Sequence, residues 1–425
     1  MEGYGREREL IATFLDKVRT FARTFAGWSE PGRETTPRKG TENRLVLLRL
    51  ALAAGLVAGL LLSPNLWVSA RPYPLTPLLD AVPPLPYPAD YALFGLFVAL
   101  VAGVGVTRGR IVGWLATGVL TLATFFVLED ESRLQPWFYQ YSFMLAAFCL
   151  YGWGRMSASD AFNTCRLIVA ATYFWSGLQK ANAGFFEVTY PWLVEPLTSW
   201  LPGWAGFALL SGAYAVPVVE TAIGLGLLTR RFRKFAVIGA LLMHAFIMLC
   251  VGPLGSDHNT VVWPWNFAMS AFVLILFWRA PDEPSPSTIL EPGQNLSPGS
   301  ALRAAVLVLF AFMPLFNFLG LWDSYLSSSL YSGASKQAYV LVWDGSGWQG
   351  TGIANLAWQE LNTPAYPEER VFKSVFAQRW CEAGRDKELR RVQAGYSEPV
   401  LRVDGRPDIL SGERSAEFYS CDDVL

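Results

Sequence analysis

The chain has 425 residues, of which 52% are hydrophobic and only 16% are charged. A soluble domain carries about 25% charged residues, so this composition predicts a chain that lies largely in a membrane. The net charge of -1 excludes the basic surface of a nucleic-acid-binding protein, and no nucleic-acid partner is expected.

Residues 1–44 are rich in arginine and lysine and contain no apolar stretch. A cleavable signal peptide needs such a stretch, so we interpret this region as a cytoplasmic N-terminal tail that helps to orient the first span. Residues 10–27 have an alternative interpretation as an amphipathic helix on the membrane surface.

Nine apolar stretches follow the tail. A hydrocarbon core about 30 Å thick requires roughly 20 residues of helix, and the stretches that meet this need are 45–64, 91–107, 111–128, 138–153, 166–186, 205–228, 235–252, 262–279 and 302–322. The sequence therefore predicts an all-α polytopic membrane bundle of about nine transmembrane helices, over residues 45–322.

The loops between these stretches indicate one orientation. If the N-terminus is cytoplasmic, every inner loop is basic, as at Arg108, Arg155 and Arg230, whereas the outer loops carry mostly acidic residues. An excess of lysine and arginine on the cytoplasmic side is the usual pattern of multi-pass proteins. Membrane lipids are therefore expected as partners.

Three segments outside the spans have their own character. Residues 65–90 hold seven prolines, which disfavour a helix interior, and are predicted to form an ordered cap on the outer surface. Residues 281–300 are rich in Pro, Ser and Gly, which predicts a flexible cytoplasmic linker.

Residues 323–425 combine short strand patterns, such as QAYVLVW, with a helical stretch at 368–384, which predicts a small C-terminal extracytoplasmic α+β domain. Cys381 and Cys421 can pair as a disulfide there, or both can stay free.

Ionisable residues inside a membrane are costly, and each is a candidate functional group. Lys180 lies 14 residues beyond Arg166, roughly 21 Å along a helix, which predicts a position in the outer third of the membrane. His244 is predicted near mid-depth, and Glu220 nearer the cytoplasmic side. Lys180 can alternatively extend its amine to the interface, and the other two can be satisfied structural residues.

Polar and aromatic side chains also gather near the predicted depth of Lys180. Tyr173, Ser176, Gly177 and Lys180 share one helical face, and segments 129–141 and 255–266 open the fourth and the eighth spans. We expect these parts to form a cavity for a flat amphipathic molecule such as a quinol, or else an aromatic belt at the interface. The candidate substrate-binding residues are Arg133, Gln135, Trp137, Tyr173, Glu220, His258 and Asn266. With only two histidines and no metal-binding motif, no metal is expected.

Residues 173–186, YFWSGLQKANAGFF, resemble a span of the vitamin K-dependent γ-carboxylases and their bacterial relatives with horizontally transferred transmembrane (HTTM) domains. That span reads roughly YF-x-AG-x-x-KL-x-x-x-W, and the resemblance covers most of residues 40–280. It implies that Lys180 is a catalytic base that deprotonates menaquinol or vitamin K hydroquinone. It also implies that His244 corresponds to a histidine of a later span, and that the chain lies in a bacterial inner membrane.

The chain departs from this family upstream of the lysine. The carboxylases carry WNNH-x-Y, where this sequence has LQPWFY with Trp137 at the position of the histidine. The resemblance therefore implies a quinol-dependent oxygenase or carboxylase-like enzyme, in which quinol deprotonation can be retained without carboxylation of glutamate. The alternatives are a non-enzymatic membrane scaffold or maturation factor, whose C-terminal domain binds a secreted peptide or protein, and a transporter.

Overall fold

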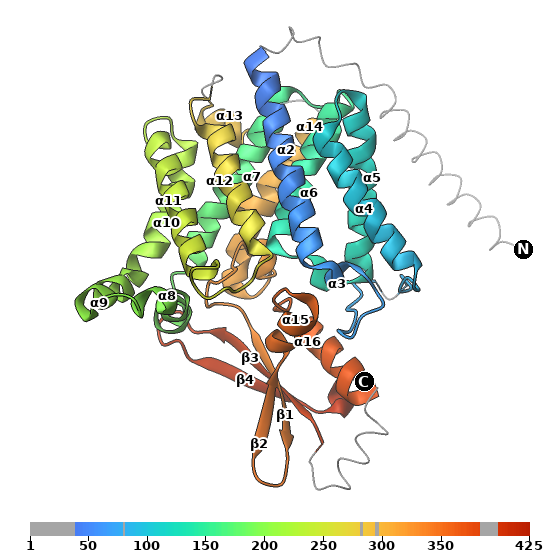
Figure 1. Ribbon diagram of the computed structural model, residues 1–425, viewed down its shortest axis with the longest axis vertical. Helices are drawn as coiled ribbons and strands as arrows, with labels where there is room; N and C mark the ends of the chain where they lie inside the picture. The colour runs from blue at the N-terminus through green and yellow to red at the C-terminus, as the bar shows by residue number, and fades with distance from the viewer. Residues whose placement is uncertain (1–38, 80, 281–283, 294–296, 383–397) are drawn as a thin grey trace, which may run out of the picture.

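The structure is a computed structural model that describes residues 39–79, 81–280, 284–293, 297–382 and 398–425. A helical bundle forms one part, and a small sheet with flanking helices lies at one end of it (Figure 1). The chain is a multi-pass membrane protein. The alternative helix at residues 10–27 lies outside the described part of the chain.

The helices of the bundle follow the predicted order. They are α2 (Lys39–Leu62), α4 (Ala89–Val106), α5 (Arg110–Glu129), α6 (Pro136–Gly152), α7 (Ala158–Gln179), α10 (Ala215–Leu228), α11 (Arg233–Val251), α12 (Val262–Phe277) and α14 (Pro298–Val306). The last continues through η4 (Leu307–Phe312) and η5 (Met313–Leu319). Among the described residues the first helix is α2, and it begins at Lys39, within the last part of the predicted tail 1–44.

Among the described residues, six helical stretches are long and apolar enough to span a membrane. They are Gly40–Leu62, Ala89–Val106, Arg110–Glu129, Gly203–Leu228, Arg233–Val251 and Pro298–Leu319. The predicted count of nine is therefore confirmed only for these six.

The other three predicted spans are the helices α6, α7 and α12. The first and last have 17 and 16 residues, and α7 carries Asp160 and Arg166. Most side chains of α7 are buried within the protein. A helix enclosed by other helices does not need an apolar surface toward lipid. The length of its apolar stretch is therefore a poor test of whether α7 spans the membrane.

The predicted span 205–228 is bent. Its first part is α9 (Gly203–Ser211), which projects sideways from the bundle in Figure 1, beside α8 (Tyr190–Thr198). The turn η3 (Gly212–Tyr214) then leads into α10. Trp204 and Phe207 on α9 are 79% and 73% exposed, as expected of aromatic residues at a membrane interface. The helix therefore changes direction at η3, within the predicted span.

The predicted flexible linker 281–300 is packed where the structure describes it. Its short helix α13 (Pro286–Leu290) is capped by Ser285, and Ile289 is buried. Arg233 and Arg303 each donate a hydrogen bond of 2.6 Å to linker carbonyl groups, at Pro284 and Thr288. These buried guanidinium groups need acceptors, and the linker backbone supplies them.

The predicted outer cap is ordered. Leu66 and Trp67 of the single turn α3 (Pro64–Trp67) are buried against the bundle, and so is Tyr73, which follows it. The prolines prevent a helix here, and the buried side chains hold the chain in place.

The C-terminal part contains a four-stranded antiparallel sheet in the order β2-β1-β3-β4. The strands are β1 (Gln337–Trp343), β2 (Trp348–Gly352), β3 (Val400–Pro407) and β4 (Arg414–Tyr419), and β1 is the predicted QAYVLVW. The helices α15 (Ile353–Leu361) and α16 (Glu369–Phe376) pack with this sheet, and η7 (Ala377–Glu382) packs with α16. The turn η6 (Tyr325–Ser327) lies nearer the bundle. Val340 pairs with Leu401 in the centre of the sheet, and both are buried.

Cys381 and Cys421 form a disulfide, with their Cα atoms 5.5 Å apart. It joins η7 to the terminal turn η8 (Cys421–Asp423). Disulfides persist in oxidising compartments, so this bond is consistent with an extracytoplasmic domain.

Several polar contacts join this domain to the end of the bundle that carries the outer cap. Arg370 on α16 pairs with both Asp323 and Glu131. Asn362 donates a hydrogen bond of 2.8 Å to the Leu62 carbonyl at the end of α2. The domain is therefore attached to the bundle at more than one helix end.

Candidate functional site

Two glycines allow α7 and α10 to approach closely. A Cβ atom on Gly177 would lie 2.4 Å from the Thr221 nitrogen, and one on Gly224 would lie 2.6 Å from the Phe174 nitrogen. Such distances are not possible between real atoms, so only glycine fits at both positions. Small residues at the same face commonly permit this close helix packing in membranes.

This packing brings Lys180 and Glu220 together. The Lys180 Nζ lies 2.8 Å from the Glu220 Oε2, and the two side chains are only 11% and 8% exposed. The same amine donates to the Ser176 Oγ at 2.7 Å and to its carbonyl at 3.1 Å. Lys180 is therefore held inside the protein at the end of α7 rather than extended to the interface.

The predicted depth of Glu220 was wrong. Because α9 turns aside, Glu220 lies in the second turn of α10 and meets Lys180, which directly follows the last residue of α7. The carboxylate is thus near the same end of the bundle as the amine, instead of toward the cytoplasmic side.

A second polar group consists of Tyr173, His244 and Asn266. The Asn266 amide donates to the Val262 carbonyl at 2.8 Å, so its Oδ1 faces the His244 Nδ1, also at 2.8 Å. An oxygen acceptor requires that Nδ1 carry the proton. In neutral histidine Nε2 is then the acceptor, and the Tyr173 hydroxyl donates to it at 2.6 Å. The hydrogen bonds therefore determine one tautomer of His244.

Both polar groups line one cavity of about 450 Å³, which we call the membrane cavity. This volume falls within the usual range of ligand pockets, roughly 300–1,000 Å³. Most of the remaining lining is apolar and comes from α8, α10, α11 and α12, with Val219, Leu242 and Phe246 among its members. The cavity can therefore hold a molecule with one polar part and a larger apolar part. Among the predicted site residues, those that line it are Tyr173, Lys180, Glu220, His244 and Asn266.

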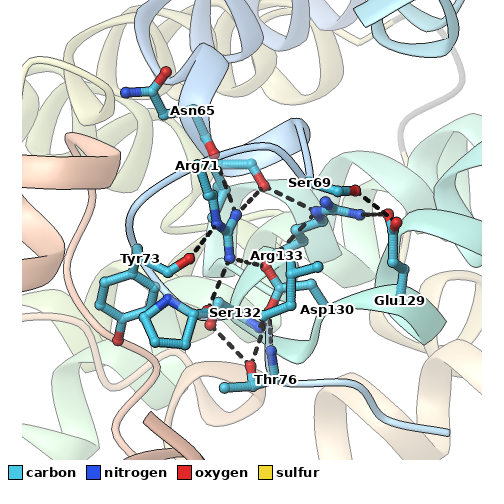
Figure 2. Close-up of polar contacts among 12 residues, drawn as sticks. Asn65, Ser69, Arg71, Tyr73, Thr76, Glu129, Asp130, Ser132 and Arg133 are labelled. Atoms are coloured by element: carbon cyan, nitrogen blue, oxygen red, sulfur yellow. Dashed lines mark hydrogen bonds and ion pairs between the residues drawn. The ribbon is translucent and has the colours of Figure 1, made fainter. Parts of the chain in front are cut away.

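Arg133 lies outside this cavity, in the buried network of Figure 2. It donates to the Glu129 carboxylate at 2.6 Å and to the Leu66 carbonyl at 2.8 Å. Arg71 contacts Asp130 at 2.5 Å in the same network. Burial opposes ionisation of Asp130, but Arg71 and Arg133 outweigh it and lower the pKa of this carboxyl. This network connects the outer cap to the loop after α5.

Gln135 and Trp137 also lie outside the membrane cavity. The Gln135 amide donates to the carbonyl groups of Ser132, at 3.0 Å, and Pro364, at 3.2 Å, and so contacts the C-terminal domain. Trp137 is 2% exposed and packs against Trp67. The expected cavity wall from segment 129–141 is therefore absent, because these side chains are used in packing the outer cap and the domain.

His258 lines a second cavity of about 440 Å³, which we call the outer cavity. Its ring contacts those of Trp192 and Trp358, with centroid distances of 5.2 and 4.5 Å. Burial lowers the pKa of His258, which favours the neutral imidazole. Segment 255–266 is thus divided, with His258 in the outer cavity and Asn266 in the membrane cavity.

Leu330 and Tyr331 line both cavities and separate them. The Tyr331 hydroxyl accepts a hydrogen bond of 2.6 Å from Asn259, and its ring stacks on Trp192 with centroids 6.1 Å apart. The sequence did not identify this partition, because it joins the C-terminal segment to a loop some 70 residues earlier.

Other cavity residues were also missed. Trp265 lies on α12 beside Asn266, and Tyr190 lies on α8. Trp265 was within the aromatic segment 255–266, which is a signal that could have identified it. Tyr190 had no such signal, since a tyrosine near a membrane interface is common.

No family model, curated protein or solved structure matches this chain.

Proposed function

We propose that this chain is a membrane enzyme that binds a quinol, such as menaquinol or vitamin K hydroquinone, and removes a quinol proton with Lys180. The observation that carries this proposal is the buried amine of Lys180, paired with Glu220 at 2.8 Å, at the polar end of a largely apolar cavity. The resemblance of residues 173–186 to the vitamin K-dependent γ-carboxylases supports the same assignment.

The proposed step is a proton transfer from a quinol hydroxyl to the neutral amine of Lys180. It leaves a quinolate anion and a lysine ammonium group, and Glu220 balances the charge of the latter. Molecular oxygen is the co-reactant that then adds to the quinolate. A general base must be unprotonated to act, so only the neutral amine of Lys180 can accept the quinol proton.

The Tyr173–His244–Asn266 chain forms a second polar point on the cavity wall. The Tyr173 hydroxyl donates its own proton to His244, so its oxygen is left to accept a hydrogen bond from a ligand hydroxyl. We propose that this contact orients the quinol ring, while Lys180 acts on its proton.

Carboxylation of glutamate is not included in the proposal. Trp137, at the position of the family's carboxylation histidine, is buried against Trp67 and is not part of the membrane cavity. The departure supports a quinol-dependent oxygenase rather than a complete carboxylase.

The test combines two measurements on purified protein. Mass spectrometry of extracted lipid should find quinone enriched over the amount in the surrounding membrane. Oxygen consumption with reduced menaquinone should be lost in the double variant Lys180→Met/Glu220→Gln, which removes the base but keeps the charge balance. Lys234→Met, at an exposed lysine, is the control and should retain activity. Equal activity in the double variant and the wild type would disprove the role of Lys180.

A second candidate function is a scaffold or maturation factor for a secreted peptide or protein. The outer cavity favours it, because this cavity is lined by the aromatic rings of Trp192, His258 and Trp358 and by further residues of the C-terminal domain. Such a role predicts that the double variant at Lys180 and Glu220 still supports production of the secreted partner. A Trp358→Ala variant would instead impair it.

A further inference from the structure

The membrane cavity reaches the surface of the bundle between α10 and α11. Val219 on α10 and Leu242 on α11 both line the cavity, and they are 50% and 67% exposed. Both helices lie at the edge of the bundle in Figure 1. A residue that faces a cavity and is also exposed on an outer helix indicates an opening, and here it faces the lipid.

Packed residues close this gap on both sides of the opening. Toward the loop that joins α10 and α11, the two helices are in close contact, since a Cβ on Gly226 would lie 2.8 Å from the Ala236 Cβ. Toward the other end, a buried apolar cluster joins α8, η3 and the end of α11 and includes Tyr190, Ala213 and Val251. The opening is therefore limited to the middle of the helix pair.

The chemical character of the lining changes along the cavity. Lys180, Glu220 and His244 form its polar region, and the path past Val216, Met243 and Leu242 is apolar. A polar ring can occupy the first region only if the rest of the ligand is apolar. A long hydrocarbon tail on such a ligand would extend along this apolar lining toward the exposed Leu242.

The outer cavity adjoins the membrane cavity at Leu330 and Tyr331. Leu330 and Tyr331 stand between the two cavities, and Tyr331 is held by its hydrogen bond with Asn259 and its stacking on Trp192. Entry from the outer cavity would require these contacts of Tyr331 to break, whereas entry from the lipid side would not.

We propose that the membrane cavity is loaded from the bilayer through the opening at Val219 and Leu242. Its ligand is an amphiphile with a polar head and a single hydrocarbon tail, which passes between α10 and α11. Only the chemical identity of the head rests on the proposed quinol function, because the path of the tail follows from the lining of the cavity.

The experiment narrows the opening with Leu242→Trp in the full-length chain, reconstituted in lipid nanodiscs. Menadione and menaquinone-4 share a ring, but only the second has a prenyl tail. We expect Leu242→Trp to weaken menaquinone-4 binding by about tenfold, equivalent to about 1.4 kcal/mol, with much less effect on menadione. Leu225→Trp is the control. Leu225 lies on α10 and is exposed like Leu242, at 50%, but it does not line the cavity.

A second probe separates this inference from the quinol assignment. A fatty acid with a photoreactive group near its carboxylate should label cavity residues in the wild type and not in Leu242→Trp. If neither quinone binds while this probe still labels, the quinol function is wrong and the lateral opening is supported. An unchanged affinity of both quinones, or an equal loss for both, together with unchanged fatty-acid labelling, would overturn the opening. Val219→Trp repeats the test if Leu242→Trp does not fold.

Discussion

Lys180 and Glu220 are 40 residues apart in the sequence, yet their charged groups lie 2.8 Å apart at the contact of α7 with α10. Gly177 lies at the same contact and leaves no space for a side chain. The distance between the two charges therefore depends on how closely the two helix backbones pack.

The first prediction concerns this pair. Removing one partner of a buried ion pair leaves the other charge uncompensated and costs about 3–5 kcal/mol, so Lys180→Met and Glu220→Gln should each lower the thermal stability of the purified protein. The double variant should lose less than the sum of the two single variants. Additive losses in a thermal-unfolding cycle would mean that the two groups do not interact.

The second prediction concerns Arg133. Its guanidinium contacts Glu129 and the Leu66 carbonyl in a buried network, so Arg133→Met should lower the free energy of unfolding by about 3–5 kcal/mol. Arg231→Met, at an exposed arginine, should change it by less than about 0.5 kcal/mol. Binding of quinone by the folded fraction of Arg133→Met should be unchanged. A selective loss of binding, without loss of stability, would instead assign Arg133 to the ligand site.

The third prediction concerns the disulfide. Cys381 and Cys421 are 40 residues apart, and a loop of this length corresponds to roughly 4 kcal/mol in the chain-entropy model. Cys381→Ser/Cys421→Ser should therefore increase hydrogen exchange in β1 and β3, while the helices of the bundle keep their protection. Cys250→Ser is the matched control, because Cys250 is a free buried cysteine. Unchanged exchange in the sheet would show that the disulfide does not stabilise the domain.

The fourth prediction concerns the pH dependence of the C-terminal domain. A hydrogen bond from Lys373, with further ones from Tyr419 and Lys336, lowers the pKa of Glu369 from 4.5 to about 2. Because the folded-state pKa is lowered, the stabilisation is complete above pH 4.5 and is lost as the pH falls toward 2. Exchange in β4 and α16 should increase over this range in the wild type.

The matched variant for this prediction is Glu369→Gln, which cannot titrate. Its sheet should be less stable at neutral pH and should show a weaker dependence on pH between 4.5 and 2. An identical pH profile in the variant and the wild type would mean that another carboxylate controls the acid response.

Local features of the sequence determined the helices, the main strands and several candidate groups of this protein. Apolar runs predicted the positions of the bundle helices, since a helix satisfies its own backbone hydrogen bonds and needs only apolar side chains to enter lipid. The run QAYVLVW, which is followed by Asp and Gly turn residues, predicted β1 for a similarly local reason. The spacing of Tyr173, Ser176 and Lys180 likewise predicted one polar face of α7, because helical period relates residues three, four and seven apart.

Tertiary structure alone decided which of these groups meet. Because the helix bends at η3, Glu220 lies beside Lys180. Arg133 contacts Glu129 in the buried network at the outer cap and does not line the cavity. Tyr331 reached the cavity from the C-terminal segment. Such contacts depend on where helices turn and how closely their backbones pack, and both follow from interactions between segments that are distant in the sequence. The membrane cavity and its opening between α10 and α11 therefore became visible only in the folded chain.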